Sequence, residues 1–208
     1  MQQPYQTIRD FFDCYGYSNA ISILGRMIKT ADSGKTWNGR SPSDLIYFTE
    51  KLNELIDAVY YIVHRFEYRP EVMLDKDIND DIWELKDYPA FCGWHGSSSP
   101  WDFFPRHLSK KEFLDPYRAL EKFTKYSNHL RWKDVIKDIL YHALSQIYLD
   151  EFDNGKRILR TYIHLHKLIE ATHLIEVRII DDEIKPRRKW KDRTDIEKPQ
   201  TDGTTAFE

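Results

Sequence analysis

Cysteine is scarce in this chain, and long apolar runs are absent. Its 208 residues include two cysteines, Cys14 and Cys92, which are too few for a disulfide framework of the secreted type. No stretch approaches the roughly 18 uncharged apolar residues of a membrane span. The amino-terminal residues MQQPYQTIRDFF lack the basic start and the apolar run of a signal peptide. We therefore expect a cytoplasmic protein with no membrane partner.

Strong net charge is also lacking, but the charge is unevenly distributed. The chain carries −3 overall. The segment from Lys185 to Arg193 holds six basic residues and one acid, so it carries +5 and the remainder carries −8. An acidic body repels a phosphate backbone, and only the basic segment would attract one.

An internal repeat dominates what is present. Residues 5–33 align without a gap on residues 117–145, a shift of 112, and their apolar positions coincide. With one inserted residue the frame continues, so that residues 52–65 align on residues 165–178. The aligned pairs include Tyr5 with Tyr117, Phe11 with Phe123, Leu24 with Ile136, Ala31 with Ala143, Leu52 with Leu165, Ile56 with Ile169 and Arg65 with Arg178. Such self-similarity predicts two copies of one structural unit.

Helical periodicity and capping residues define the units. Ser41 followed by Pro42 predicts a helix start, and apolar residues then recur at helical spacing from Leu45 to Phe66. In the second unit, Ser109 and Glu112 form a capping box, and a last helix is expected from about Lys156 to Glu176. Each unit thus consists of a short helix followed by two longer ones.

The predicted fold is all-α, with two related three-helix units packed as a helical bundle. Helical unit 1 covers residues 1–66 and helical unit 2 covers residues 108–180. An aromatic-rich segment, residues 67–107, connects them, and residues 181–208 are expected to form a charged, disordered tail. The two units should cover one another's apolar faces.

The aromatic-rich segment has two interpretations. Its dense aromatic residues can pack over the helices, or they can form a surface for a protein partner. The candidate partner-binding residues are Trp94, His95, Trp101, Phe103 and Phe104. The sequence leaves both interpretations open.

His166, Glu170 and His173 form the densest set of candidate metal ligands. They lie at i, i+4 and i+7, on one side of a helix, and Glu170-x-x-His173 has the spacing used in di-iron bundles. The repeat aligns His166 with Asn53 and His173 with Tyr60, outside the predicted buried row. It therefore favours flanking positions for both histidines, and no second Glu-x-x-His completes a bridged site. We expect no cofactor.

Two further functions remain as alternatives. The first alternative is a helical enzyme, either metal-dependent through the histidines and Glu170 or ribonuclease-like. The spacing of Arg160 and His166 is similar to the loose Arg-x4–6-His spacing of HEPN-type ribonucleases, which are helical. A nucleic-acid-associated protein is the other, because basic residues beside an aromatic ring can hold phosphate and stack on a base. Its candidate residues are Lys185, Arg187, Arg188, Lys189, Trp190, Lys191 and Arg193.

The pattern Asp115-Pro116-Tyr117, Phe123, Trp132 and Ala143-Leu144-Ser145 resembles that of uncharacterised helical proteins of Bacteroides-type bacteria, some carried on mobile elements. The Phe11-Phe12 start and the segment 55–59 are similar too. This resemblance covers the two units and implies no activity. Since every catalytic or cofactor pattern is incomplete, the sequence favours a non-enzymatic interaction or scaffold protein, with an unknown protein partner or a second copy of the chain.

Overall fold

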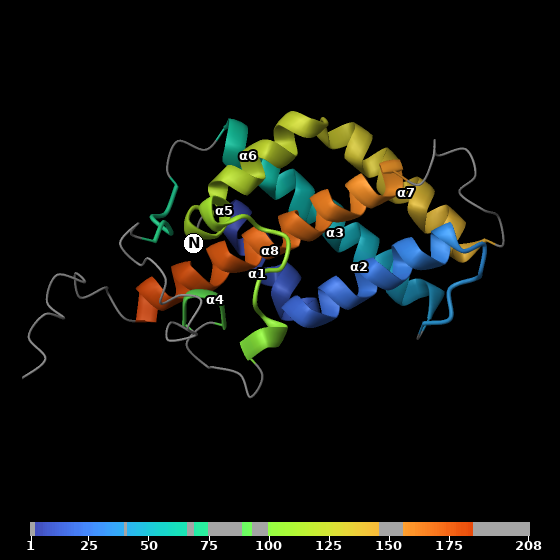
Figure 1. Ribbon diagram of the computed structural model, residues 1–208, viewed down its shortest axis with the longest axis horizontal. Helices are drawn as coiled ribbons and strands as arrows, with labels where there is room; N and C mark the ends of the chain where they lie inside the picture. The colour runs from blue at the N-terminus through green and yellow to red at the C-terminus, as the bar shows by residue number, and fades with distance from the viewer. Residues whose placement is uncertain are drawn as a thin grey trace, which may run out of the picture.

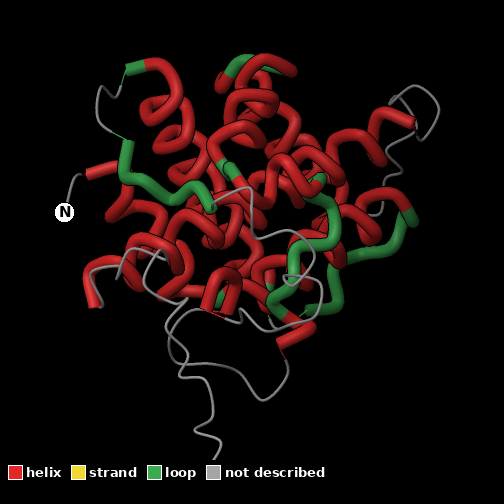
Figure 2. The backbone as a smooth tube through the Cα atoms, turned by 60° about the vertical axis from the view of Figure 1, so that its left-hand side comes forward, coloured by secondary structure: helices red, strands yellow, loops and turns green. Residues whose placement is uncertain are grey.

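The computed structural model describes residues 3–39, 41–65, 69–74, 89–92, 100–145 and 156–184. All regular secondary structure in these residues is helical (Figure 2). The elements are α1 (Gln3–Tyr15), α2 (Tyr17–Asp32), α3 (Pro42–His64), α4 (Pro89–Cys92), the 3-10 turn η1 (Pro100–Asp102), α5 (Lys110–Leu114), α6 (Tyr117–Tyr126), α7 (His129–Leu144) and α8 (Lys156–Ile184). The predicted all-α class is therefore confirmed for this part of the chain.

The six longer helices pack into one bundle, and α8 runs along most of its length (Figure 1). Helix α2 lies against α7. Helix α8 contacts α1, α2 and α6, whereas α3 contacts α6, α7 and α1. The first three-helix group, α1 to α3, thus packs mainly on the second group, α6 to α8, and the apolar faces of the two groups share one continuous core.

Under the shifts found in the sequence, α1 and α2 correspond closely in their bounds to α6 and α7, and α3 begins nearly where α8 does, but α8 continues past the end of α3. Helices α2 and α7 have the same length and are displaced by 112 residues at both ends. The contacts between groups are reciprocal too, since α1 and α2 contact α8 as α6 and α7 contact α3. The hydroxyls of the aligned residues Tyr5 and Tyr117 lie 3.0 Å apart in a hydrogen bond between the groups.

The predicted apolar faces are buried. On α3, residues Leu45, Phe48, Leu52, Leu55, Ile56, Val59 and Ile62 are at most 1% exposed. On α7, the buried residues are Trp132, Val135, Ile136, Ile139 and Ala143. Each large apolar side chain removed from water contributes about 1.5–3 kcal/mol, so these rows hold the helices together.

Helix α8 is longer than its periodicity predicted. It ends at Ile184 rather than near Glu176, and so enters the segment predicted as a disordered tail. Val177 and Arg178 are buried beyond the predicted end. The Arg178 guanidinium donates to the carbonyls of Val72 and Phe113, at 3.0 and 2.8 Å, which fixes this last part of the helix against its neighbours.

The capping box at the start of α5 is confirmed, and its carboxylate also contacts other helices. The backbone N–H of Ser109 donates to the Glu112 carboxylate at 2.8 Å. Glu112 is buried, and its two oxygens also accept hydrogen bonds from Lys122 of α6 and Lys167 of α8, at 2.8 and 2.9 Å. One carboxylate therefore joins three helices beside the segment described next.

Candidate functional site

A fully buried carboxylate holds the loop that precedes α5 against α8. Glu170 Oε1 accepts a hydrogen bond from the backbone N–H of Arg106 at 2.6 Å, and Oε2 accepts one from Leu108 at 3.1 Å. The N–H of His107 donates to both oxygens at 3.1 Å. Three consecutive amides thus bind one carboxylate, which anchors the loop.

Two imidazole rings lie beside the same carboxylate. Nδ1 of His166 lies 3.2 Å from Glu170 Oε1, and Nδ1 of His107 lies 3.5 Å from that oxygen. The centres of the two rings are 3.9 Å apart. Both Nδ1 atoms are buried, and neither is oriented to form a hydrogen bond. In the part of the chain that the structure describes, these residues form the only His/Cys/Asp/Glu group suited to a metal ion, with ligand atoms within 4.8 Å.

The charges at this cluster follow from its surroundings. Burial raises the pKa of Glu170, but His166 and the N–H groups of Arg106 and His107 lower it more strongly, so it lies below its ordinary value. Burial, together with the neighbouring His166, lowers the pKa of His107. At neutral pH, therefore, Glu170 is an anion and His107 is uncharged, with one ring nitrogen able to act as an electron-pair donor.

His173 does not belong to this cluster. Its Nε2 lies 3.0 Å from the carbonyl oxygen of Phe91, and its ring stacks on Tyr17 at a centroid distance of 4.6 Å. Its Nδ1 lies 3.8 Å from the carboxylate of Glu176. Of the three predicted metal ligands, the structure brings His166 and Glu170 together and supplies His107 in place of His173.

The prediction that the two histidines lie at the flank was wrong. His166 and His173 are 3% and 5% exposed, whereas the aligned residues Asn53 and Tyr60 on α3 are half-buried. The cause is the segment between the units. Helices α4 and α5 pack on α8, and the amides of residues 106–108 bind Glu170. These segments have no counterpart in the aligned residues of the first unit, so the alignment could not predict that they cover this side of α8.

The described part of the aromatic-rich segment packs against the bundle while leaving one ring in solvent. Phe103 and Phe104 are half-buried against the apolar clusters. Trp101 is 57% exposed and lies 6.1 Å from the Phe104 ring. Trp94 and His95 lie outside the described residues. The partner-binding role of these residues stays a prediction.

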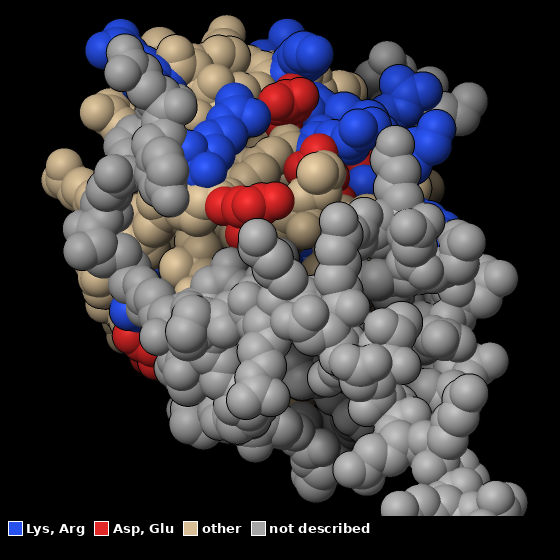
Figure 3. Space-filling model, turned by 90° about the vertical axis from the view of Figure 1, so that its left-hand side faces the viewer, with Lys and Arg blue, Asp and Glu red and all other residues tan. Residues whose placement is uncertain are grey.

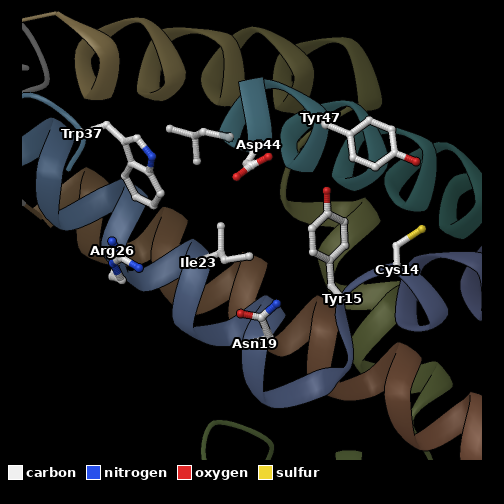
Figure 4. Close-up of a pocket in the computed structure, with 9 residues that line it drawn as sticks. Cys14, Tyr15, Asn19, Ile23, Arg26, Trp37, Asp44 and Tyr47 are labelled. Carbon is white, nitrogen blue, oxygen red and sulfur yellow. The ribbon is translucent and has the colours of Figure 1, made fainter. Parts of the chain in front are cut away.

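A second candidate site is a pocket of about 470 Å³ at the junction of α1, α2 and α3 (Figure 4). Cys14 and Tyr15 come from the end of α1, Arg26 from α2, and Asp44 and Tyr47 from the start of α3. Pockets for small molecules or for single anchoring side chains commonly have volumes of about 300–1,000 Å³, so this one is large enough to be occupied.

Trp37 forms one end of the pocket. Its backbone N–H donates to the carbonyl of Ala143 at 2.8 Å, which attaches the loop after α2 to the end of α7. The guanidinium of Arg26 lies 4.7 Å from the centre of a Trp37 ring. A Cβ at Gly39 would come within 2.2 Å of the indole, so this position accepts only glycine while the indole keeps its place.

Tyr15 forms the floor of the pocket beside Tyr47, with ring centroids 6.3 Å apart. Burial is the main cause that raises the pKa of Tyr15 to about 12, so its hydroxyl is neutral. Tyr15 Oη and Trp37 Nε1 are both buried without a hydrogen-bond partner. Both groups belong to residues that line the pocket, but the two polar atoms themselves are closed off from solvent.

The basic residues predicted to contact nucleic acid, Lys185 to Arg193, lie outside the described residues. In the described part of the face shown in Figure 3, Lys and Arg side chains gather in the upper part of the view, with a few Asp and Glu side chains beside them. Arg160 is exposed and His166 is buried, so these two residues do not share an accessible surface of the kind that a ribonuclease needs.

Sequence reasoning missed His107 and the residues of the pocket. His107 stands far from His166 in the chain, and no spacing rule links a loop residue to a helix that folds over it. The pocket combines single residues from four segments. The nearness of Gly39 to Trp37 in the sequence is the only local sign of the close approach that shapes it.

Comparison with models of known protein families, with curated proteins and with solved structures gives no match. The resemblance to uncharacterised proteins of Bacteroides-type bacteria therefore stays a prediction. No helix within the described residues combines the length and the apolar character that crossing a membrane requires.

Proposed function

We propose that the chain is a non-enzymatic helical binding protein, and that the pocket between α1, α2 and α3 takes a segment of a protein partner. The pocket itself carries the proposal, because aromatic rings that are partly open to solvent line it together with the carboxylate of Asp44. Tyr47 is 47% exposed at its rim, and Tyr15 and Trp37 are half-buried within it. Aromatic anchors partly open to solvent are typical of protein interfaces.

The polar groups define what the partner segment offers. An aromatic or aliphatic side chain would fill the space between the rings. Asp44 adds a carboxylate to the wall, and the chain outside its basic segment is acidic. A segment that carries a basic residue next to its apolar anchor fits this combination.

Selection of peptides from a random displayed library tests the proposal without knowledge of the natural partner. Peptides selected on the wild-type chain should lose at least tenfold in affinity for Tyr47→Ala. They should bind Tyr141→Ala unchanged, since Tyr141 is 58% exposed on α7 and outside the pocket. Peptides that bind both variants equally, or turnover of a substrate by the purified protein, would contradict the proposal.

We also propose that the helices α1 to α3 and the helices α6 to α8 are two copies of one unit that arose by internal duplication. It is supported by the matching bounds of α2 and α7 and by the reciprocal contacts of α8 and α3. Superposition of residues 17–32 and 43–62 on residues 129–144 and 156–175 tests it. A single rotation should bring both helices into register, and a need for two different rotations argues against duplication.

Nucleic-acid binding through Lys185–Arg193 is the second candidate, and the +5 charge of that segment favours it. Affinity for a single-stranded oligonucleotide should fall steeply with salt. A chain that ends at Ile184 should not bind. Equal binding by the truncated and full chains would exclude the segment as the contact.

A further inference from the structure

We propose that His107, His166 and Glu170 form a zinc site that fastens the loop before α5 to helix α8. The site is separate from the pocket at α1, α2 and α3, and it does not depend on the function proposed for that pocket. Its three ligands come from two segments, so that one ion would hold both.

The two distances from Glu170 to the imidazole nitrogens are close to those that a tetrahedral zinc ion requires. Zinc binds imidazole nitrogen at about 2.0–2.1 Å and carboxylate oxygen at about 2.0–2.2 Å, which places neighbouring ligand atoms about 3.4 Å apart. Glu170 Oε1 lies 3.2 Å from Nδ1 of His166 and 3.5 Å from Nδ1 of His107. Two imidazole nitrogens with one carboxylate oxygen also form a ligand set that binds zinc in preference to calcium or magnesium.

Both imidazole nitrogens lie at ion-pair distance from Glu170 Oε1, and neither makes a hydrogen bond. His166 is 3% exposed, and its Nδ1 faces Glu170 without making a hydrogen bond. Nδ1 of His107 is likewise buried and unpartnered. Buried polar atoms are almost always hydrogen-bonded in folded proteins, so two buried nitrogens that face one carboxylate oxygen without a hydrogen bond are positioned to share one ion with it.

The amides on Glu170 are compatible with an ion at the same carboxylate. A carboxylate has about four acceptor positions, and the N–H groups of Arg106, His107 and Leu108 make four hydrogen bonds to them, two on each oxygen. An ion at Oε1 therefore requires the N–H of His107, which donates to both oxygens, to donate to Oε2 alone. Hydrogen bonds of this kind commonly orient a metal-binding carboxylate from behind. The side chain of His107 is 28% exposed, which gives an ion access and leaves room for a water molecule as the fourth ligand.

Titration of the full chain with Zn²⁺ tests the site, after removal of any affinity tag and of bound metal by a chelator. The wild type should bind one Zn²⁺ per chain. At a free Zn²⁺ concentration of about 100 times Kd, the melting temperature should rise by roughly 5–10 °C. Substitution of Co²⁺ should give the visible absorption bands of a tetrahedral site.

His107→Ala is the decisive variant, because this residue lies on a loop at the edge of the cluster and its loss does not open the core. It should weaken Zn²⁺ binding at least 100-fold and abolish the Co²⁺ bands, while the metal-free protein keeps its helical circular dichroism. His64→Ala, which removes an exposed histidine on α3, should leave both unchanged. No stoichiometric binding by the wild type, or equal binding by His107→Ala, would overturn the assignment.

Discussion

Replacement of Glu170 tests whether one buried carboxylate fixes the loop at residues 106–108. Removal of an acceptor from a buried N–H costs about 1–3 kcal/mol, and Glu170 serves three of them. Partial access of water reduces the sum, so Glu170→Ala should lower the free energy of unfolding by about 3–6 kcal/mol. Because this is a large part of the roughly 5–15 kcal/mol that a typical domain possesses, the milder variant Glu170→Gln is the better probe.

Glu170→Gln keeps the shape of the side chain and one acceptor oxygen, but it turns an NH2 group toward an N–H donor and removes the charge. We expect it to lower the free energy of unfolding by about 2–4 kcal/mol, measured by urea denaturation in the presence of a chelator. The amides of residues 106–108 should exchange with solvent at least 30-fold faster, which corresponds to about 2 kcal/mol.

The matched control is Glu54→Gln. Glu54 is 52% exposed and paired with Lys51 on the surface of α3, so the same chemical change there should leave stability nearly unaltered. If Glu170→Gln and Glu54→Gln behave alike, and the exchange of amides 106–108 is unchanged, then Glu170 does not anchor the loop.

Three further predictions concern other parts of the molecule. Although burial raises it, hydrogen bonds from two lysines and the capping box hold the pKa of Glu112 at about 2, below its ordinary 4.5; its contribution is complete above pH 4.5 and is lost as the pH falls toward 2. Unfolding followed across that interval should show a shallower fall in stability for Glu112→Gln than for the wild type. Tyr117→Phe removes the bond to Tyr5 and should cost about 1 kcal/mol, measured by thermal unfolding; an unchanged melting temperature would contradict this. Gly39→Ala forces its Cβ against the Trp37 indole. It should lower the free energy of unfolding, measured in urea, by about 1–3 kcal/mol, and it should weaken peptide binding at the pocket. Unchanged stability and unchanged peptide binding would show that the loop adjusts freely.

Helical periodicity was sufficient for most of the fold, because the apolar rows of α3 and α7 are strong and are bounded by clear capping residues. Ser41 accepts a hydrogen bond from the N–H of Ser43, and Pro42 occupies the first helical position. The end of α8 was harder to predict. Beyond Glu176 the chain is charged, and the burial of Val177 and Arg178 depends on segments far away in the sequence.

The candidate sites could not be derived in the same way, because each depends on contacts between distant segments. His107 approaches His166 only because three backbone amides bind Glu170, and backbone amides carry no sequence signal. The pocket at Tyr15 similarly requires the loop that carries Trp37 to turn back onto α7. Such arrangements follow from tertiary packing rather than from local pattern.

The aligned positions of the two groups nevertheless separate what is common from what is particular. The ring contact of Tyr60 with His129 has its counterpart in the contact of His173 with Tyr17, so an aromatic–histidine pair occurs at both places with the residue types exchanged.

The aligned acids Asp57 and Glu170, in contrast, lie in different environments. Asp57 is exposed and bonded to Lys133 at 2.6 Å, whereas the aligned Glu170 is buried under a loop that only the second group possesses. An acid that serves helix packing alone has no need of a buried environment, since a surface ion pair is sufficient there and desolvation of a carboxylate is costly. The buried Glu170, held by three backbone amides with two imidazole nitrogens at ion-pair distance, is therefore the clearest departure from the common pattern, and it is where the proposed zinc ion would bind.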